Sequence, residues 1–400
     1  PRIAAPGIVS SEDFKSCPIG TYDATRFNQL IDQLQLARHQ AQLSSSSSSA
    51  VPKVFGSSSK KIAHKKALVP TQSKPSTAVS ASAKKEEAEL RAKIKSDPEA
   101  KKLPADIIET IMNEVRDPKK TTFDDISGLK EVKQILEQTC ILPSIRPDLY
   151  TGMRAPPKGI LLYGPPGNGK TMLARAAANE AGCTFLSMSA STLMSKWVGE
   201  SEKLMRAMFV VARALQPTIV FLDEVDSLIR VRGASDNESS RRLKTQFLIE
   251  MDGATSDAGK RVLILAATNR PQELDDAAIR RFTKRVCIPM PSLETKIGLI
   301  STMLKSMKKD KIAVKVSKKE IKAIASKCNG FSCSDISTLV KSACNEPLMS
   351  LSAKELRSVK KEDLRPVVSD DFMTIIKVTK PSIPPENLKA FDDWTRDYGS

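Results

Sequence analysis

The stretch Gly159–Ala178, GILLYGPPGNGKTMLARAAA, decides the fold of this chain. It opens with an apolar run of strand length and closes with strong helix formers. The turn between them has the glycine spacing of a phosphate-binding loop, in the strand–loop–helix context that this motif requires. We therefore predict a nucleotide-binding α/β domain built around this stretch.

The predicted phosphate loop assigns a role to each kind of residue in it. Glycines let the backbone wrap the phosphates, and amide groups at the start of the helix face the anion. Lys170 supplies positive charge and Thr171 binds Mg²⁺. The predicted nucleotide-binding residues are Gly164, Pro165, Pro166, Gly167, Asn168, Gly169, Lys170, Thr171 and Met172.

Two further apolar runs end in polar side chains. The run Ile219–Leu222 leads into Asp223 and Glu224, which we expect to hold Mg²⁺ and to polarise the attacking water, respectively. The run Val262–Ala267 leads to Asn269, whose amide we expect beside the γ-phosphate. Together with the phosphate loop, these residues predict hydrolysis of ATP with Mg²⁺ as cofactor.

Arg280 and Arg281 lie far from the phosphate loop in sequence. In a monomer they would be ordinary surface cations. In a ring of subunits they would reach a neighbour's γ-phosphate and neutralise charge in the transition state.

The order of apolar patterns predicts how the chain is divided. Apolar runs alternate with helical patterns up to about Pro289, which is typical of a parallel α/β sheet, and only helical patterns follow. Before the sheet, residues 44–85 hold eight lysines and no acidic residue. We expect a poorly ordered segment with a short helix (1–43), a disordered basic linker (44–102), a linker helix (103–122), the α/β ATPase domain (123–290), and a helical lid with a C-terminal helix (291–400).

Composition limits the possible chemistry and partners. Two histidines make a Ser-His triad or a histidine-rich metal site hard to assemble, and seven scattered cysteines are typical of reduced thiols. The net charge of +17 favours a polyanionic partner. No apolar run is long enough to span a bilayer, and the initial proline suggests a piece of a longer protein.

These motifs together resemble those of the AAA ATPases. The resemblance is strongest to the branch that holds spastin, katanin, fidgetin and the endosomal-sorting disassembly ATPase. The segments 164–174, 269–275 and 280–286 are most similar to those of spastins. The similarity extends over roughly residues 103–400.

The resemblance implies an ATP-dependent homo-hexamer whose central pore grips a peptide and pulls it through. Its pore residues fall on Lys196, Trp197 and Val198, with Arg241 and Arg242 in a second pore loop. Two positions depart from the family pattern. Trp197 replaces the usual tyrosine, and Cys333 replaces a glycine. Cys333 would be either a thiol near the nucleotide that makes turnover sensitive to oxidation or a small buried side chain.

The resemblance also implies a substrate, namely microtubules gripped by their acidic tubulin tails and severed by extraction of tubulin. The basic segment Lys53–Lys85 would bind the microtubule surface, which predicts a cytoplasmic, cytoskeletal protein. Its lysine clusters also fit a nuclear import signal, so a nuclear or perinuclear pool stays open. One alternative is disassembly of membrane-remodelling filaments, and another is a scaffold that binds nucleic acid. No base-reading motif favours specific nucleic-acid binding, and nothing in the sequence implies a membrane.

Overall fold

The computed structural model describes residues 77–116, 121–195, 201–230, 238–256, 261–359 and 363–399. The predictions for residues 1–43, for most of the basic linker and for the pore residues Lys196, Trp197 and Val198 lie outside these ranges. Along the described chain, no helix is long and apolar enough to cross a membrane.

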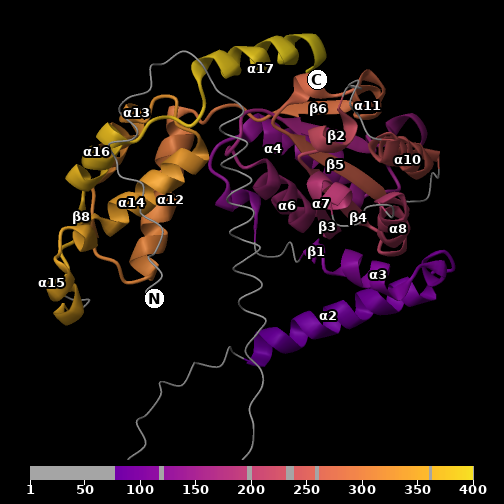
Figure 1. Ribbon diagram of the computed structural model, residues 1–400, viewed down its shortest axis with the longest axis horizontal. Coiled ribbons are helices and arrows are strands. Elements are labelled where there is room, and N and C mark those ends of the chain that lie inside the picture. Colours follow the sequence, from indigo (N-terminus) through magenta and orange to yellow (C-terminus); the bar gives the residue numbers. More distant parts are fainter. Residues whose placement is uncertain are drawn as a thin grey trace, which may run out of the picture. The chain divides into compact units, whose positions relative to one another are not determined.

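A six-stranded sheet with the order β1-β3-β4-β5-β2-β6 forms the centre of the α/β domain (Figure 1). Its strands are β1 (Val115–Arg116), β2 (Gly159–Tyr163), β3 (Thr184–Ser189), β4 (Thr218–Asp223), β5 (Val262–Thr268) and β6 (Lys284–Cys287). All neighbouring pairs are parallel except β1 with β3. The predicted strands are therefore confirmed, and an antiparallel edge strand is added.

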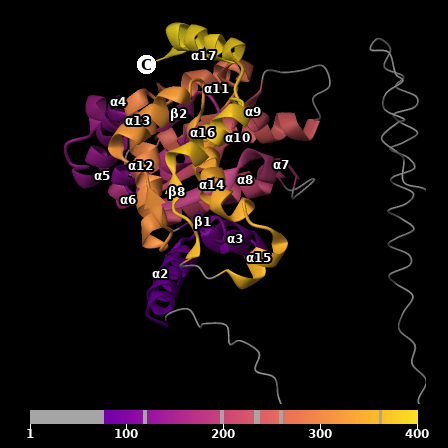
Figure 2. The same cartoon turned by 90° about the vertical axis from the view of Figure 1, so that its left-hand side faces the viewer.

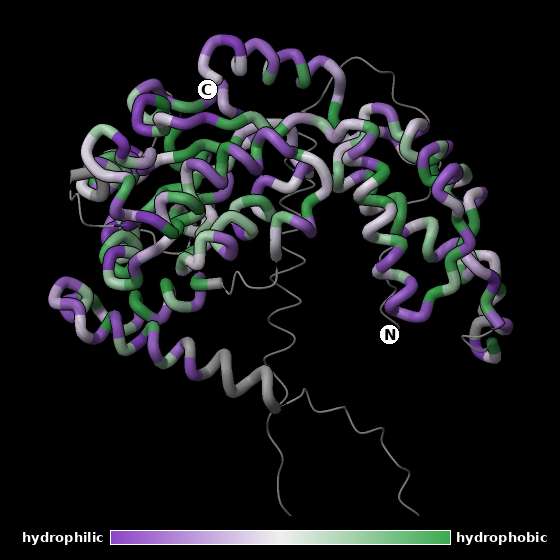
Figure 3. Tube along the Cα trace, turned by 180° about the vertical axis from the view of Figure 1, so that it is seen from behind, coloured by the Kyte–Doolittle hydropathy of each residue, from purple (hydrophilic) through white to green (hydrophobic). Residues whose placement is uncertain are grey.

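Helices cover both faces of this sheet, which explains why its strands are nearly continuous apolar runs. They are α3 (Ala105–Met112), α4 (Lys130–Leu136), α5 (Leu142–Ile145), α6 (Lys170–Glu180), α7 (Ala190–Ser195), α8 (Ser201–Ala214), α9 (Asp226–Ile229), α10 (Glu238–Ser256) and α11 (Asp276–Arg281). Alternate residues of β2 point to opposite faces, because Leu161 packs with α8 and α10 while Ile160 packs with α4 and α6. Figure 3 shows the hydrophobic residues concentrated along these inner strands.

The C-terminal helices form a lid with a hydrophobic core of its own, which includes Ile300, Ile324, Leu339 and Phe372. Figure 2 shows these helices gathered into one bundle. The elements of the lid are α12 (Leu293–Lys309), α13 (Lys318–Lys327), α14 (Cys333–Met349), α15 (Ala353–Ser358) and α16 (Ser369–Val378), with the short parallel pair β7 (Val314–Lys315) and β8 (Val367–Val368).

The last helix, α17 (Pro385–Tyr398), leaves the lid and packs on the α/β domain (Figure 1). Its Phe391 and Trp394 are buried in the main core. The Trp394 and Tyr163 rings pack edge to face, with their centroids 4.4 Å apart. The Tyr163 hydroxyl donates a hydrogen bond to Thr395 Oγ1 at 3.0 Å. The C-terminal helix is thus anchored to the strand that leads into the phosphate loop.

The predicted disorder of residues 44–102 is wrong for its last part. Thr77–Ser96 form a 20-residue helix, α2, and Ala100–Lys102 form a 3-10 turn. Ile94 and Ala100 are almost fully buried in the main core, so packing holds this segment. The predicted linker helix is also shorter than residues 103–122, because α3 ends at Met112 and β1 follows.

Candidate active site

The phosphate loop joins β2 to α6 in a conformation that only glycine adopts easily. Gly164 has a φ of 136°, and a Cβ atom there would lie 2.3 Å from the Ile288 carbonyl oxygen. Gly169 has a φ of 87° and precedes the first residue of α6. The loop therefore leads its backbone into the positive end of an 11-residue helix, where a phosphate is stabilised.

Lys170 is held at the loop by backbone oxygens. Its side chain is 7% exposed, and its Nζ donates hydrogen bonds to the carbonyl oxygens of Gly164 at 2.8 Å and Pro165 at 3.0 Å. Burial lowers the pKa of Lys170 to about 8, although the nearby Asp223 carboxylate favours the charged form. An incoming phosphate would raise this pKa again, so the ammonium group is poised to bind an anion.

Thr171 and Asp223 come together across 52 residues of sequence. The Thr171 hydroxyl donates a hydrogen bond to Asp223 Oδ2 at 2.8 Å. A hydroxyl beside a carboxylate suits Mg²⁺, which prefers oxygen ligands and takes one or two carboxylates together with substrate phosphates. Among the described residues, no group of three or more acidic, cysteine or histidine side chains is placed to hold a metal ion.

Glu224 directly follows Asp223 and is exposed in a strained backbone conformation. Its φ is 52°, which is unusual for a residue with a side chain, and its backbone N–H donates to Asp223 Oδ1 at 3.0 Å. Such strain costs free energy and is found mainly at functional sites. Here it turns the chain sharply at the end of β4, next to the Thr171–Asp223 pair.

Asn269 follows β5, the strand between β4 and β2. Its Oδ1 atom is buried and has no hydrogen-bond partner among the residues described. The neighbouring Thr268 hydroxyl donates to Asp226 Oδ1 at 2.6 Å, which fixes the end of β5 against the segment after β4. The carboxyl ends of three adjacent parallel strands thus bring together the phosphate loop, Asp223 with Glu224, and an unpaired amide oxygen.

The phosphate loop also contacts the lid, a contact that the sequence did not predict. The first amides of α14 are bound by this loop, because Cys333 N–H donates to Asn168 Oδ1 at 3.1 Å and Ser334 N–H donates to the Gly167 oxygen at 2.9 Å. Asn168 is 4% exposed and also donates to the Met290 sulfur at 3.4 Å. The loop therefore caps a lid helix, a role usually taken by one side chain before the helix.

Cys333 lies beside the phosphate loop and is partly buried, which is compatible with both interpretations of its departure from the family pattern. Burial raises the pKa of its thiol, which keeps it protonated and weakly reactive. Its backbone makes the contact with Asn168, so the proximity does not depend on the thiol. Sensitivity of turnover to oxidation stays a prediction.

The two predicted arginine fingers have different surroundings. Arg281 is paired within its own chain, through two hydrogen bonds to the Asp252 carboxylate at 2.8 and 2.6 Å and one to the Ala277 oxygen at 2.8 Å. Arg280 is exposed and makes no hydrogen bond or ion pair with the part of the chain that the structure describes. Arg280 is therefore the more available of the two for a second subunit.

The predicted second pore loop is only partly described. Arg241 and Arg242 are exposed, but they lie near the start of α10 rather than in a loop. Arg242 pairs with Glu238, one turn earlier on the same helix. The helical position follows from the good helix formers of this segment.

Two family models match the chain. The model described as "ATPase family associated with various cellular activities (AAA)" matches residues 160–290, and the "Vps4 C terminal oligomerisation domain" matches residues 349–399. Among solved structures, the FIGL-1 AAA domain in complex with ADP is 38% identical with a TM-score of 0.68, covering 74% of this chain and 98% of that one. The chain belongs to the AAA ATPase family.

Other AAA proteins are also similar to this chain. Spastin of Gallus gallus is 44% identical over 327 residues, which cover 82% of this chain and 51% of that protein. Spastin of Bos taurus is 47% identical over 290 residues, covering 72% and 46%. A structure titled "Structural Basis for Katanin Self-Assembly" is 34% identical with a TM-score of 0.62, covering 74% and 98%. The chain spans about half the length of the curated spastins it matches.

Membership in the AAA family implies nucleotide binding, and the site at the carboxyl ends of β2, β4 and β5 has the groups for it. Pro165 is buried, whereas Pro166 and Gly167 are exposed and Met172 is 43% exposed at the first turn of α6. The individual roles of these residues stay predictions.

Proposed function

We propose that this chain hydrolyses Mg·ATP at the carboxyl ends of β2, β4 and β5. The observation that carries the proposal is the 2.8 Å contact between Thr171 and Asp223, with Glu224 next to it and the unpaired Asn269 oxygen on the adjacent strand. Lys170 and the loop amides bind the phosphates, and Thr171 and Asp223 hold the metal. Glu224 orients and polarises the attacking water, and Asn269 accepts a hydrogen bond from that water. Bound Mg²⁺ neutralises phosphate charge.

The active unit is a homo-hexameric ring that forms with ATP. A match to an oligomerisation domain over residues 349–399 supports assembly, and the exposed, unpaired Arg280 is suited to act on the neighbouring subunit's nucleotide. In this arrangement each active site is completed by a second copy of the chain. Arg281 instead braces α11 through Asp252, so its contribution to the neighbour is indirect.

The substrate we propose is the microtubule, which the ring severs by pulling on acidic tubulin tails. Similarity to spastins over most of the chain supports this substrate, as does the net charge of +17, which suits an acidic polymer. Lys196, Trp197 and Val198 would grip the tail in the pore, with Arg241 and Arg242 adding charge. The protein would then act in the cytoplasm on the microtubule cytoskeleton.

Fluorescent microtubules fixed to a glass surface test this function. Wild-type protein with ATP should cut them, and Glu224→Gln should bind ATP and decorate the microtubules without cutting. Cutting by Glu224→Gln would refute the role of Glu224. Normal ATP turnover without any cutting by the wild type would refute the substrate and leave the ATPase assignment intact.

A further inference from the structure

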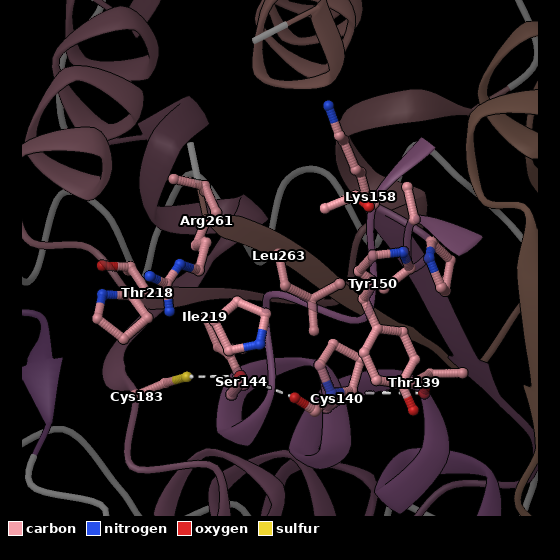
Figure 4. Close-up of a pocket in the computed structure, with 18 of the residues that line it drawn as sticks. Thr139, Cys140, Ser144, Tyr150, Lys158, Cys183, Thr218, Ile219, Arg261 and Leu263 are labelled. Carbon is pink, nitrogen blue, oxygen red and sulfur yellow. Dashed lines mark hydrogen bonds between the residues drawn. The ribbon is translucent and has the colours of Figure 1, made fainter. Parts of the chain in front are cut away.

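A cavity of about 650 Å³ lies at the end of the sheet opposite the active site (Figure 4). Its walls come from the segment Thr139–Lys158, from Cys183, and from the first residues of β4 and β5. We call it the amino-end cavity. A strand of five or six residues separates it from the phosphate loop, which at 3.3 Å per residue is roughly 16–20 Å. The volume lies within the usual range for sites that bind small molecules.

The amino-end cavity contains a buried hydroxyl without a partner. Thr218 is 1% exposed, lines the cavity, and its Oγ1 makes no hydrogen bond within the described structure. Its backbone N–H is already used, because it donates to the Arg261 oxygen at 3.0 Å. Since buried hydroxyls are normally hydrogen-bonded, Thr218 offers a donor to something that occupies the cavity.

Positive charge stands at the wall of the same cavity. The Arg261 side chain lines it and makes no hydrogen bond or ion pair with the residues described. The guanidinium lies near Cys183, since its charge partly opposes the rise in the pKa of that thiol caused by burial. The carboxylate in the lining, that of Asp148, is already bound at both oxygens by Arg146, at 2.9 and 2.6 Å.

The remaining walls are mainly apolar. Much of the lining comes from the side chains of Tyr150, Ile219 and Leu263 and from the prolines at 143, 156 and 157. Ile219 and Leu263 are partners on the neighbouring strands β4 and β5, and Figure 4 shows Leu263 beside Ile219. Such walls favour a flat hydrophobic body over a nucleotide triphosphate. The rigid prolines keep the cavity open without a ligand, which reduces the ordering cost of binding.

We propose that the amino-end cavity is a second ligand site, which binds a small amphipathic anion. The apolar body of the ligand packs against the proline-rich wall and Leu263, its carboxylate or sulfonate pairs with Arg261, and an oxygen of the ligand accepts a hydrogen bond from Thr218. Binding is independent of nucleotide, because the site lies at the opposite ends of the strands.

A pair of fluorescent probes tests the site on the full chain with saturating ADP. The anionic probe 1-anilinonaphthalene-8-sulfonate should bind at one site per chain. The neutral probe N-phenyl-1-naphthylamine has the same aromatic body without the sulfonate, so it should bind at least tenfold more weakly. Equal affinity for the two probes would overturn the charge pairing.

Matched variants locate the site. Arg261→Gln should weaken binding of the sulfonate probe at least tenfold and leave the affinity for the neutral probe unchanged. Thr218→Val should weaken binding of the sulfonate probe severalfold. Arg154→Gln removes the same charge from an exposed residue of the wall-forming segment that does not line the cavity, so it should change neither affinity.

Hydrogen exchange gives an independent location. The sulfonate probe should slow amide exchange in residues 139–158 of the wild type, and slow it less in Arg261→Gln at the same probe concentration. Equal probe affinity in Arg261→Gln and Arg154→Gln, or protection elsewhere in the chain, would overturn the proposal. Both variants change solvent-exposed arginines, so melting temperatures equal to that of the wild type are expected and verify folding.

Discussion

The contact between the phosphate loop and the lid predicts a specific loss of nucleotide affinity. In the wild type, Asn168 Oδ1 accepts a hydrogen bond from the first amide of α14, that of Cys333, at 3.1 Å, and the bond is partly buried. Asn168→Ala removes the acceptor and leaves a backbone N–H without a partner. We expect the lid to dock less firmly on the loop, and the loop to be less well organised for phosphates.

The cost of a buried amide without a partner sets the upper limit of the effect, because the bond is only partly buried. That cost is about 1–3 kcal/mol, which corresponds to a loss of affinity between about fivefold and about 150-fold if it falls wholly on the nucleotide-binding conformation. Cys333→Pro removes the donor instead, and water can reach the remaining oxygen more easily, so we expect a smaller loss of about two- to tenfold. Proline suits this position, because it is the first residue of α14 and Ser332 before it has a ψ of 169°.

Titration with a fluorescent ADP analogue measures the effect directly. Cys333→Ala is the matched control, because it keeps the backbone N–H and should bind ADP like the wild type. The reasoning is refuted if Asn168→Ala binds ADP with wild-type affinity. It also fails if Cys333→Ala weakens ADP binding as much as Cys333→Pro does, because the loss would then come from the side chain and not from the backbone amide.

Three further predictions concern the residues around the loop. Burial lowers the pKa of Lys170 to about 8, and bound phosphate raises this pKa again. In ADP titrations across pH 7–10, the affinity for ADP should therefore be constant below pH 8 and fall above it, by at most about tenfold per pH unit. A flat pH profile would contradict the role assigned to Lys170. Tyr163→Phe removes the hydrogen bond to Thr395 and should lower the free energy of unfolding, measured by chemical denaturation, by about 0.5–1.5 kcal/mol. An unchanged free energy of unfolding would argue against anchoring of α17 by this bond. Arg281→Ala should lower the melting temperature slightly, because the partly exposed ion pair of Arg281 with Asp252 contributes about 1 kcal/mol or less. Arg280→Ala should leave the melting temperature unchanged. A larger decrease for Arg280→Ala than for Arg281→Ala would contradict the surroundings described for these two arginines.

Local sequence predicted which residues come together at the carboxyl ends of the strands, because their placement depends on short-range patterns. Apolar runs define β2, β4 and β5, and parallel strands necessarily bring their carboxyl ends to one edge of the sheet. The glycine spacing then fixes the loop between β2 and α6. The Thr171–Asp223 contact follows from these two facts, although the residues lie 52 positions apart.

Contacts set by tertiary packing were not predictable in the same way. Ser332 and Asp335 form a capping box that marks the start of α14, but nothing in the sequence indicates that the phosphate loop binds the remaining amides. Likewise, the pairing of Arg281 with Asp252 depends on how α10 and α11 pack together. The helix α2 was not predicted, because the many lysines and serines of residues 44–85 indicate disorder, whereas the alanine and glutamate residues of α2 favour a helix.

The central claim is that each ATP site is formed by residues from two copies of the chain. Mixing two inactive variants tests this claim most directly. Glu224→Gln lacks the group that polarises water in its own site, and Arg280→Ala lacks the group given to its neighbour. In mixed rings some interfaces combine an intact Glu224 with an intact Arg280, on average about one in four for a random equal mixture. Release of labelled phosphate should therefore be near zero for each variant alone and reappear in the mixture, at about a quarter of the wild-type rate if sites act independently. A mixture as inactive as its components, in rings shown to contain both variants, would contradict a site shared between subunits.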